Sequence, residues 1–122
     1  MAGEAAQDKA IEFWGTSRED LLDDKVFPPQ ARFLIGKQLR RVQRGEEPMD
    51  WKPFDVVGAG TKELRVRLAD GAFRVLYVVK FPEYVYVLHC FKKKSEQTST
   101  RDKNIASERY KELINERKNH ER

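Results

Sequence analysis

The segment Lys62–Lys94 reads KELRVRLADGAFRVLYVVKFPEYVYVLHCFKKK, and its pattern decides the fold. Apolar and polar residues alternate in its first run, and Asp70-Gly71 and Pro82 separate this run from the next two. Alternation with a period of two is typical of strands, and Asp-Gly favours a tight hairpin. The middle run is apolar on both faces, which is typical of a central strand. The segment therefore predicts three antiparallel strands, over residues 63–68, 73–81 and 84–91.

The same segment concentrates positive charge. It holds 8 Lys/Arg and 3 Asp/Glu, a balance of +5, whereas the whole chain carries +4. The excess charge lies on the predicted sheet, so a partner rich in phosphate is the first to consider. Arg65 and Arg67 share a strand face. With the turn near residues 69–72, we expect Arg67 and Arg74 to be close to cross-strand neighbours, which costs stability unless an anion shares the site. The alternative is a solvated sheet face.

The N-terminal part predicts one strand and two helices. Residues 10–15, AIEFWG, alternate as a short strand does. Ser17 and Asp20 have the spacing of a capping box, and Pro28 limits this first helix to about two turns. A second helix is expected over residues 29–44, since proline suits a helix start and Gly45 suits the position after its end. Its apolar stripe comprises Ala31, Leu34, Ile35, Gln38, Leu39 and Val42.

Two further segments complete an α+β domain spanning residues 1–122. Residues 46–60 form a long connection, which indicates either a functional loop or packing along a strand edge, with Trp51 and Phe54 as anchors. After the last strand, Ser99 with Asp102, or Thr100 itself, is expected to cap a final helix of about 18 residues. We expect residues 1–8 to be frayed.

Composition limits the classes of function. A single cysteine, Cys90, excludes a disulfide framework and favours a reducing cytoplasm. There is no apolar run of about 18 residues and no signal-peptide pattern, so no membrane segment is expected. The two histidines and Cys90 lack metal-ligand spacing, so no metal site is expected. His89 and Cys90 should point to opposite strand faces, which excludes a nucleophilic pair. For His89, a partly buried strand position is weighed against a catalytic role.

Five segments resemble the HigB-like toxins of the RelE/ParE superfamily, in particular the branch of phage-derived host-inhibition toxins. They span the chain from Phe13 to Ile114 in the family's order: REDLLDD, PPQARFLIGKQLRRVQRGEEPMDWKPF, ELRVRLADGAFRVLYVVKF, YVLHCFKKKSEQT and RYKELI. The resemblance implies an N-terminal strand and two helices, a three-stranded antiparallel meander and a C-terminal helix. This order matches the one expected from the residue pattern.

The resemblance also implies a function. Similar proteins are toxins of type II toxin–antitoxin pairs, and the RelE and HigB kinds are mRNA interferases, ribosome-dependent endonucleases that need no metal or cofactor. The ParE kind instead inhibits DNA gyrase, and a non-enzymatic binding protein derived from a toxin is a third alternative. The implied partners are the ribosome, its mRNA and a HigA-like helix-turn-helix antitoxin, all in the cytoplasm. The antitoxin would dock on the basic face, on the second helix or on the 46–60 loop.

Cleavage of RNA by its own 2′-hydroxyl needs a base, an acid and cations for the charge that develops. The resemblance implies that Arg74 pairs the scissile phosphate and that a lysine of Lys92–Lys94 acts as acid. The tyrosine that RelE-type toxins carry after the last strand has no counterpart here. His89, Glu63 or the ribosome remains as the base, or the transition state is held mainly by electrostatics without a strong base. The catalytic candidates are Arg74, Arg67, Lys93 and His89, and the RNA-binding candidates are Arg65, Lys92, Lys94 and Lys62.

Overall fold

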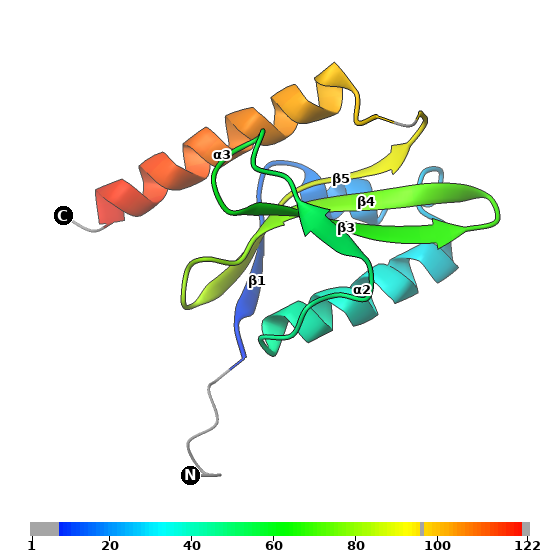
Figure 1. The fold of residues 1–122 in the computed structure, drawn as a ribbon, viewed down its shortest axis with the longest axis horizontal. Helices are drawn as coiled ribbons and strands as arrows, with labels where there is room; N and C mark the ends of the chain where they lie inside the picture. Colours follow the sequence, from blue (N-terminus) through cyan, green and yellow to red (C-terminus); the bar gives the residue numbers. More distant parts are fainter. Residues whose placement is uncertain (1–7, 96, 121–122) are drawn as a thin grey trace, which may run out of the picture.

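The computed structural model describes residues 8–95 and 97–120, and it has the expected α+β architecture (Figure 1). The expectation that residues 1–8 are frayed falls outside the described part of the chain, except at Asp8, whose carboxylate lies 2.6 Å from the Arg40 guanidinium. The elements in chain order are β1 (Ala10–Phe13), α1 (Ser17–Leu21), α2 (Pro29–Gln43), β2 (Trp51–Pro53), β3 (Thr61–Leu68), β4 (Gly71–Val78), β5 (Tyr84–Lys93) and α3 (Thr100–His120).

The sheet has five strands in the order β1-β5-β4-β3-β2. The predicted meander β3-β4-β5 forms its centre, and β1 extends it by pairing in parallel with β5. β4 lies in the middle of the sheet, and its residues from Phe73 to Val78 are buried. The apolar character of both faces of this strand follows from that position, as the sequence predicted.

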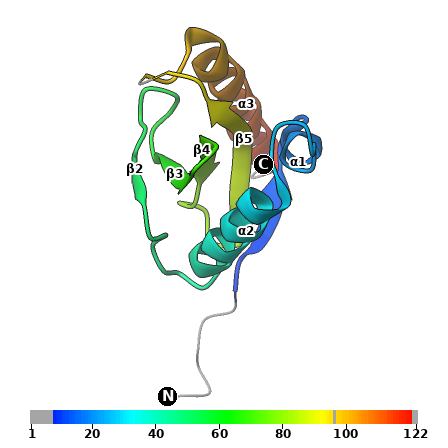
Figure 2. The same ribbon diagram turned by 90° about the vertical axis from the view of Figure 1, so that its right-hand side faces the viewer.

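The helix α2 covers one face of the sheet, and α3 lies on the opposite side (Figures 1 and 2). The predicted stripe of α2 is confirmed, because Ala31, Ile35, Leu39 and Val42 are buried and Leu34 packs against them. The sheet residues in this core include Leu64, Val66, Phe73, Val75, Tyr77, Val85, Val87 and Cys90.

A second core lies on the α3 side of the sheet. Ala106 and Leu113 of α3 are fully buried in it, and Tyr110 packs against it. The sheet and loop residues of this core are Phe54, Val57, Leu76, Val78, Tyr86, Leu88 and Phe91. Ser99 caps α3 as predicted, since its Oγ accepts a hydrogen bond from the Asp102 amide at 3.1 Å.

The bounds of α2 agree with the sequence signals. The helix begins at Pro29, where a missing N–H leaves no unpaired donor, and it ends at Gln43. Gly45 follows with a φ of +86°, in the left-handed region that glycine adopts without strain. The chain can therefore leave the helix directly toward the sheet edge.

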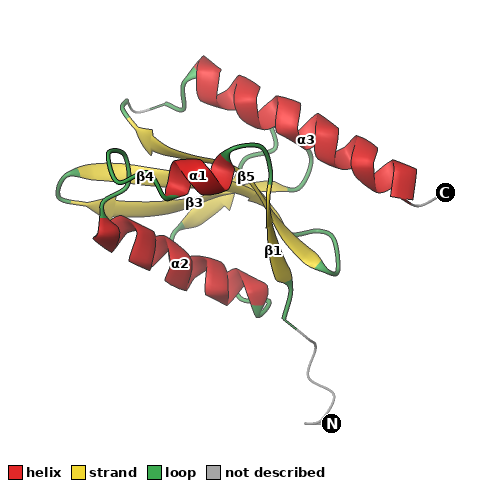
Figure 3. Cartoon of the chain, turned by 180° about the vertical axis from the view of Figure 1, so that it is seen from behind, coloured by secondary structure: helices red, strands yellow, loops and turns green. Residues whose placement is uncertain are grey.

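The predicted capping box at Ser17 is wrong. Thr16 is the residue before the first turn of α1, and its carbonyl and hydroxyl both contact Asp20. Ser17 is buried instead and donates a hydrogen bond from Oγ to the Val87 carbonyl at 3.2 Å. The hydroxyl is therefore used to fasten α1 beside β5, which Figure 3 shows from behind.

The strand β5 carries a bulge at Leu88, which has no partner in β4. An extra residue reverses the face on which the later side chains fall. Strict alternation along the strand would place Cys90 on the face of Tyr84 and Tyr86, but the bulge puts Cys90 in the α2-side core instead. By the same shift, His89 is moved to the α3 side of the sheet, opposite Leu76 of β4.

The 46–60 connection contains β2, which pairs with β3 and forms one edge of the sheet. Of the two alternatives for this segment, packing along a strand edge is thus realised. Phe54 is buried as an anchor, whereas Trp51 remains partly exposed beneath the Lys62 ammonium group. Among the residues that the structure describes, no helix is long and apolar enough to cross a membrane.

Candidate functional site

A hollow of about 390 Å³ lies on the α3 side of the sheet, beside the β3–β4 hairpin. We call it the basic hollow, and its lining residues are Arg67, Ala72, Arg74, Lys93, Lys94 and Ser95. Ala72 pairs with Arg67 on one side and with Lys93 on the other, so these three residues lie in a row across three strands. The short alanine side chain between two long cationic ones leaves the space that forms the hollow.

Arg74 is held in place by a buried carboxylate. Its side chain is 4% exposed, and its Nε lies 3.6 Å from Oε1 of the fully buried Glu63. Thr98 donates a hydrogen bond to the other oxygen of Glu63 at 3.3 Å. Burial lowers the pKa of Arg74, and the charge of Glu63 opposes this, so the guanidinium keeps its charge. The ion pair fixes Arg74 as a wall of the basic hollow.

Arg67 and Arg74, expected close to cross-strand neighbours, are diagonal neighbours that line the same hollow, and the residue directly opposite Arg74 is Arg65. The turn is shorter than expected: Leu68 pairs directly with Gly71, which shifts the register. The two cross-strand arginines do have the anions that such a contact requires. Glu63 accompanies Arg74, and the Asp50 carboxylate lies 2.7 Å from the Arg65 guanidinium.

Lys93 borders the basic hollow opposite Arg67. Partial burial lowers the pKa of its ammonium group, and the neighbouring charge of Arg74 lowers it further. A lysine with a lowered pKa gives up its proton more readily, as a general acid must. Lys94 lines the same hollow and is exposed.

Two of the predicted RNA-binding residues lie on the other face of the sheet. Lys62 is paired with Tyr77, and its Nζ lies 4.6 Å from the Trp51 ring centroid. Lys92 is paired with Phe73, and its Nζ lies 5.8 Å from that ring centroid. Lys62 and Lys92 therefore do not join the basic hollow, and the period of two separates Lys92 from its neighbour Lys93, which does.

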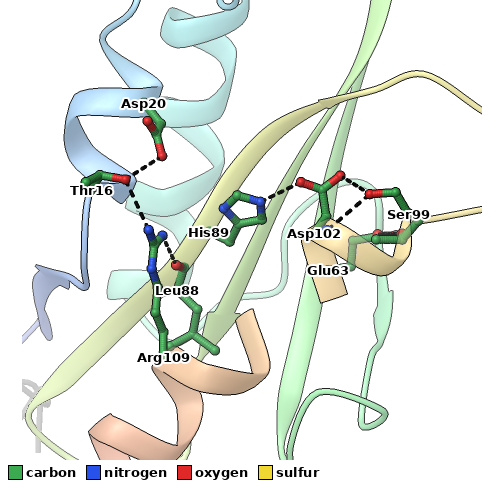
Figure 4. A network of polar contacts seen from close by, with 9 residues as sticks. Thr16, Asp20, Glu63, Leu88, His89, Ser99, Asp102 and Arg109 are labelled. Carbon is green, nitrogen blue, oxygen red and sulfur yellow. Dashed lines mark hydrogen bonds and ion pairs between the residues drawn. The ribbon is translucent and has the colours of Figure 1, made fainter. Parts of the chain in front are cut away.

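His89 lies in a different hollow, of about 520 Å³, at the edge of β5 between α1 and α3 (Figure 4). Its Nε2 lies 2.7 Å from an oxygen of Asp102, and Ser99 donates to the other oxygen at 2.7 Å. Its Nδ1 is buried without a hydrogen-bond partner in the described part of the chain. Burial lowers the pKa of His89, and the contact with Asp102 opposes this shift. The two hollows share Lys93, Lys94 and Ser95 as lining residues.

Arg109 joins the elements around this second hollow. It donates to the carbonyl of Leu88 at 2.8 Å, which satisfies the acceptor at the bulge, and to the Thr16 hydroxyl at 3.0 Å (Figure 4). The arginine therefore connects α3, β5 and the start of α1. Its role is structural, and it holds the edge against which His89 lies.

No pattern in the sequence points to Asp50 or to the Asp102–His89 pair as part of a site. Asp50 was part of a long connection, and only the pairing of β2 with β3 brings it beside Arg65. Asp102 was expected only as part of a helix cap, although its carboxylate also contacts the β5 histidine. In residues 8–95 and 97–120, no group of three or more His, Cys, Asp or Glu side chains could hold a metal ion.

The match to a known family covers the whole basic hollow. The family model described as Phage derived protein Gp49-like (DUF891) matches residues 24–111, which contain α2, the strands β2 to β5 and half of α3. No curated protein matches the chain. The Gp49-like family is phage-derived and belongs to the RelE/HigB-like toxin group. The chain therefore belongs to the Phage derived protein Gp49-like family of toxin-like proteins.

Proposed function

We propose that this protein is the toxin of a type II toxin–antitoxin pair and that it cuts mRNA on the ribosome. The observation that carries the proposal is the basic hollow, where Arg67, Arg74 and Lys93 converge on one space. Arginine forks and lysine ammonium groups are the usual protein partners of phosphate. Membership in a toxin-like family supports the same function, and action on the ribosome places it in the cytoplasm.

In the proposed reaction, the 2′-hydroxyl oxygen attacks the adjacent phosphorus and the bond to the 5′-oxygen breaks. The phosphate gains negative charge in the transition state, and cations already fixed around it lower the barrier most. Arg74, oriented by Glu63, and the exposed Arg67 supply that charge. Lys93 protonates the leaving 5′-oxygen, a role that its lowered pKa favours.

The proton acceptor of this reaction is not part of the basic hollow. Glu63 is fully buried against Arg74, and His89 lines the neighbouring hollow instead. We therefore propose that the protein acts mainly by electrostatic stabilisation and that the ribosome or a water molecule accepts the proton of the 2′-hydroxyl. With a ribosomal group as the proton acceptor, cleavage depends on the ribosome.

The proposed antitoxin partner, a HigA-like helix-turn-helix protein, needs a docking surface. Phe33 on α2 is 65% exposed and Met49 is 78% exposed, which is high for large apolar side chains. Met49 lies next to α2, because its amide donates to the Gln38 side chain at 2.7 Å. We propose that the antitoxin covers the exposed side of α2 around Phe33 together with the adjoining segment at Met49.

The experiment is induced expression without the antitoxin, with growth and primer extension on mRNA as readouts. Arg74 is not the residue to change first, because its removal breaks a buried ion pair and leaves Glu63 with only the half-exposed Lys52, 3.9 Å away, as a counter-charge. Lys93→Met is the better variant, and Lys92→Met is its matched control on the opposite face. We expect Lys93→Met to lower cleavage by about 10²-fold to 10³-fold, as losing one transition-state donor does elsewhere, and Lys92→Met to remain toxic.

Other outcomes would point elsewhere. Growth arrest with DNA damage and intact mRNA would favour a gyrase inhibitor. Absence of growth arrest in the wild type would favour a non-enzymatic binding protein. Equal toxicity of Lys93→Met and Lys92→Met would contradict the assignment of the basic hollow.

A further inference from the structure

We propose that the Asp50 carboxylate is an internal anion: in the free protein it occupies the space between Arg65 and Arg67, a second phosphate subsite, and a phosphate of the RNA strand must displace it. The inference rests on the proposed function, because it extends the path of RNA beyond the basic hollow. It also assigns Asp50 the role of an internal anion that RNA must displace.

The contacts of Asp50 carry this inference. One carboxylate oxygen accepts a hydrogen bond from Arg65 Nε at 2.9 Å and lies 2.7 Å from a terminal nitrogen of the same guanidinium. The other oxygen lies 3.8 Å from Arg67 Nε. Two oxygens sharing one negative charge thus lie between two guanidinium groups. The two non-bridging oxygens of a phosphodiester carry the same charge and suit the same donors.

The subsite is continuous with the basic hollow through Arg67. This arginine lines the hollow and also faces Asp50, and its side chain is 67% exposed. Arg65 lies two residues away on the same face of β3, a distance of about 6.6 Å along the strand. An RNA strand with one phosphate in the hollow can therefore place a neighbouring phosphate on Arg65 and Arg67.

The two carboxylates on this face differ in how readily RNA can displace them. Glu63 is fully buried beside Arg74, so separating that pair would strand a charge inside the protein. The Asp50 side chain is 39% exposed and the Arg65 side chain is 24% exposed. Ion pairs this close to solvent contribute little stability, so an incoming phosphate can replace the carboxylate. Asp50 also stays near after displacement, since its backbone carbonyl accepts from the Arg65 amide.

The test is the affinity of the whole protein for a fluorescent single-stranded oligoribonucleotide, measured by anisotropy over a series of salt concentrations. Asp50→Asn keeps an oxygen that accepts from Arg65 and removes the competing charge. We expect it to tighten binding by about threefold to tenfold at low salt and to steepen the salt slope by about 0.7. Glu47→Gln is the matched control, because it removes the same charge three residues away, where Glu47 faces Lys62 on the opposite side of the sheet. Its affinity should stay within about twofold of the wild type.

The outcomes separate this inference from the proposed function. If Arg67→Gln weakens binding while Asp50→Asn behaves like Glu47→Gln, the subsite is wrong and the RNA-binding hollow stands. If Arg67→Gln and Lys93→Met both bind RNA like the wild type, the proposed function fails as well. A second measurement needs no variant: the Arg65 Nε–H resonance of the wild type should shift on titration with the oligoribonucleotide. A fixed Arg65 signal beside a shifting Arg67 signal overturns the subsite even if Asp50→Asn fails to fold.

Discussion

The two faces of the sheet are built from alternate residues of the same strands, yet they differ in what they hold. The α2 side is apolar along β3, β4 and β5, and Lys62 and Lys92 lie at the ends of its strands. The α3 side is apolar only where α3 packs. Elsewhere it carries Glu63 and Arg65 and, toward the hairpin, the basic hollow. A period of two thus lets one segment supply a core and a binding surface, because neighbouring residues lie on opposite faces everywhere except at the Leu88 bulge.

The largest effect should come from the buried ion pair between Arg74 and Glu63, which lies between the core and the binding surface on the α3 side. We expect Arg74→Ala to lower the free energy of unfolding by about 3–5 kcal/mol, because the buried Glu63 then keeps only the half-exposed ammonium group of Lys52, 3.9 Å away, as a counter-charge. Urea denaturation followed by circular dichroism measures this change. A loss below about 1 kcal/mol would show that Glu63 becomes protonated or finds another partner.

A substitution on the α2 side should affect stability alone. Leu39 is 3% exposed in the core between α2 and the sheet. We expect Leu39→Ala to cost about 2–5 kcal/mol of unfolding free energy through lost burial and the cavity left behind. At a temperature where the variant remains folded, its affinity for an oligoribonucleotide should equal that of the wild type. Weaker binding by the folded variant would show that the two faces are coupled.

The smallest effect concerns pH and His89. Its folded pKa lies below the ordinary value of about 6.5, so the unfolded chain takes up a proton first as the pH falls. The contribution of a neutral His89 is therefore complete above about pH 6.5 and is lost as the pH falls toward the folded pKa. Urea unfolding between pH 7.5 and pH 5 should show this loss in the wild type, and His89→Gln should show less of it. Identical pH profiles for the two proteins would show that His89 does not cause the loss of stability at low pH.

Much of the fold follows from local signals in the sequence. Pro29 and Gly45 bound α2, Asp70-Gly71 marks the hairpin, and the alternation in β3 places Arg65 and Arg67 on one face. Local signals failed where one residue had two possible partners. The hydroxyl of Ser17 could cap a helix or bond to a strand, and in the structure it donates to the buried carbonyl of Val87. The bulge at Leu88 has no signature in its own segment, because Arg109 of α3 satisfies its carbonyl.

For the candidate site, the sequence by itself determined which cations belong to the sheet and, through its period of two, that Lys93 and Lys92 lie on opposite faces. Only the tertiary structure decided which of them share a hollow and which are already paired. The turn length set the register that places Arg74 beside Arg65 rather than Arg67. The counter-charge of Arg65 is Asp50, 15 residues earlier in the chain, and it becomes a neighbour only when β2 joins the edge of the sheet. Such contacts depend on packing between distant segments, and no local pattern records them.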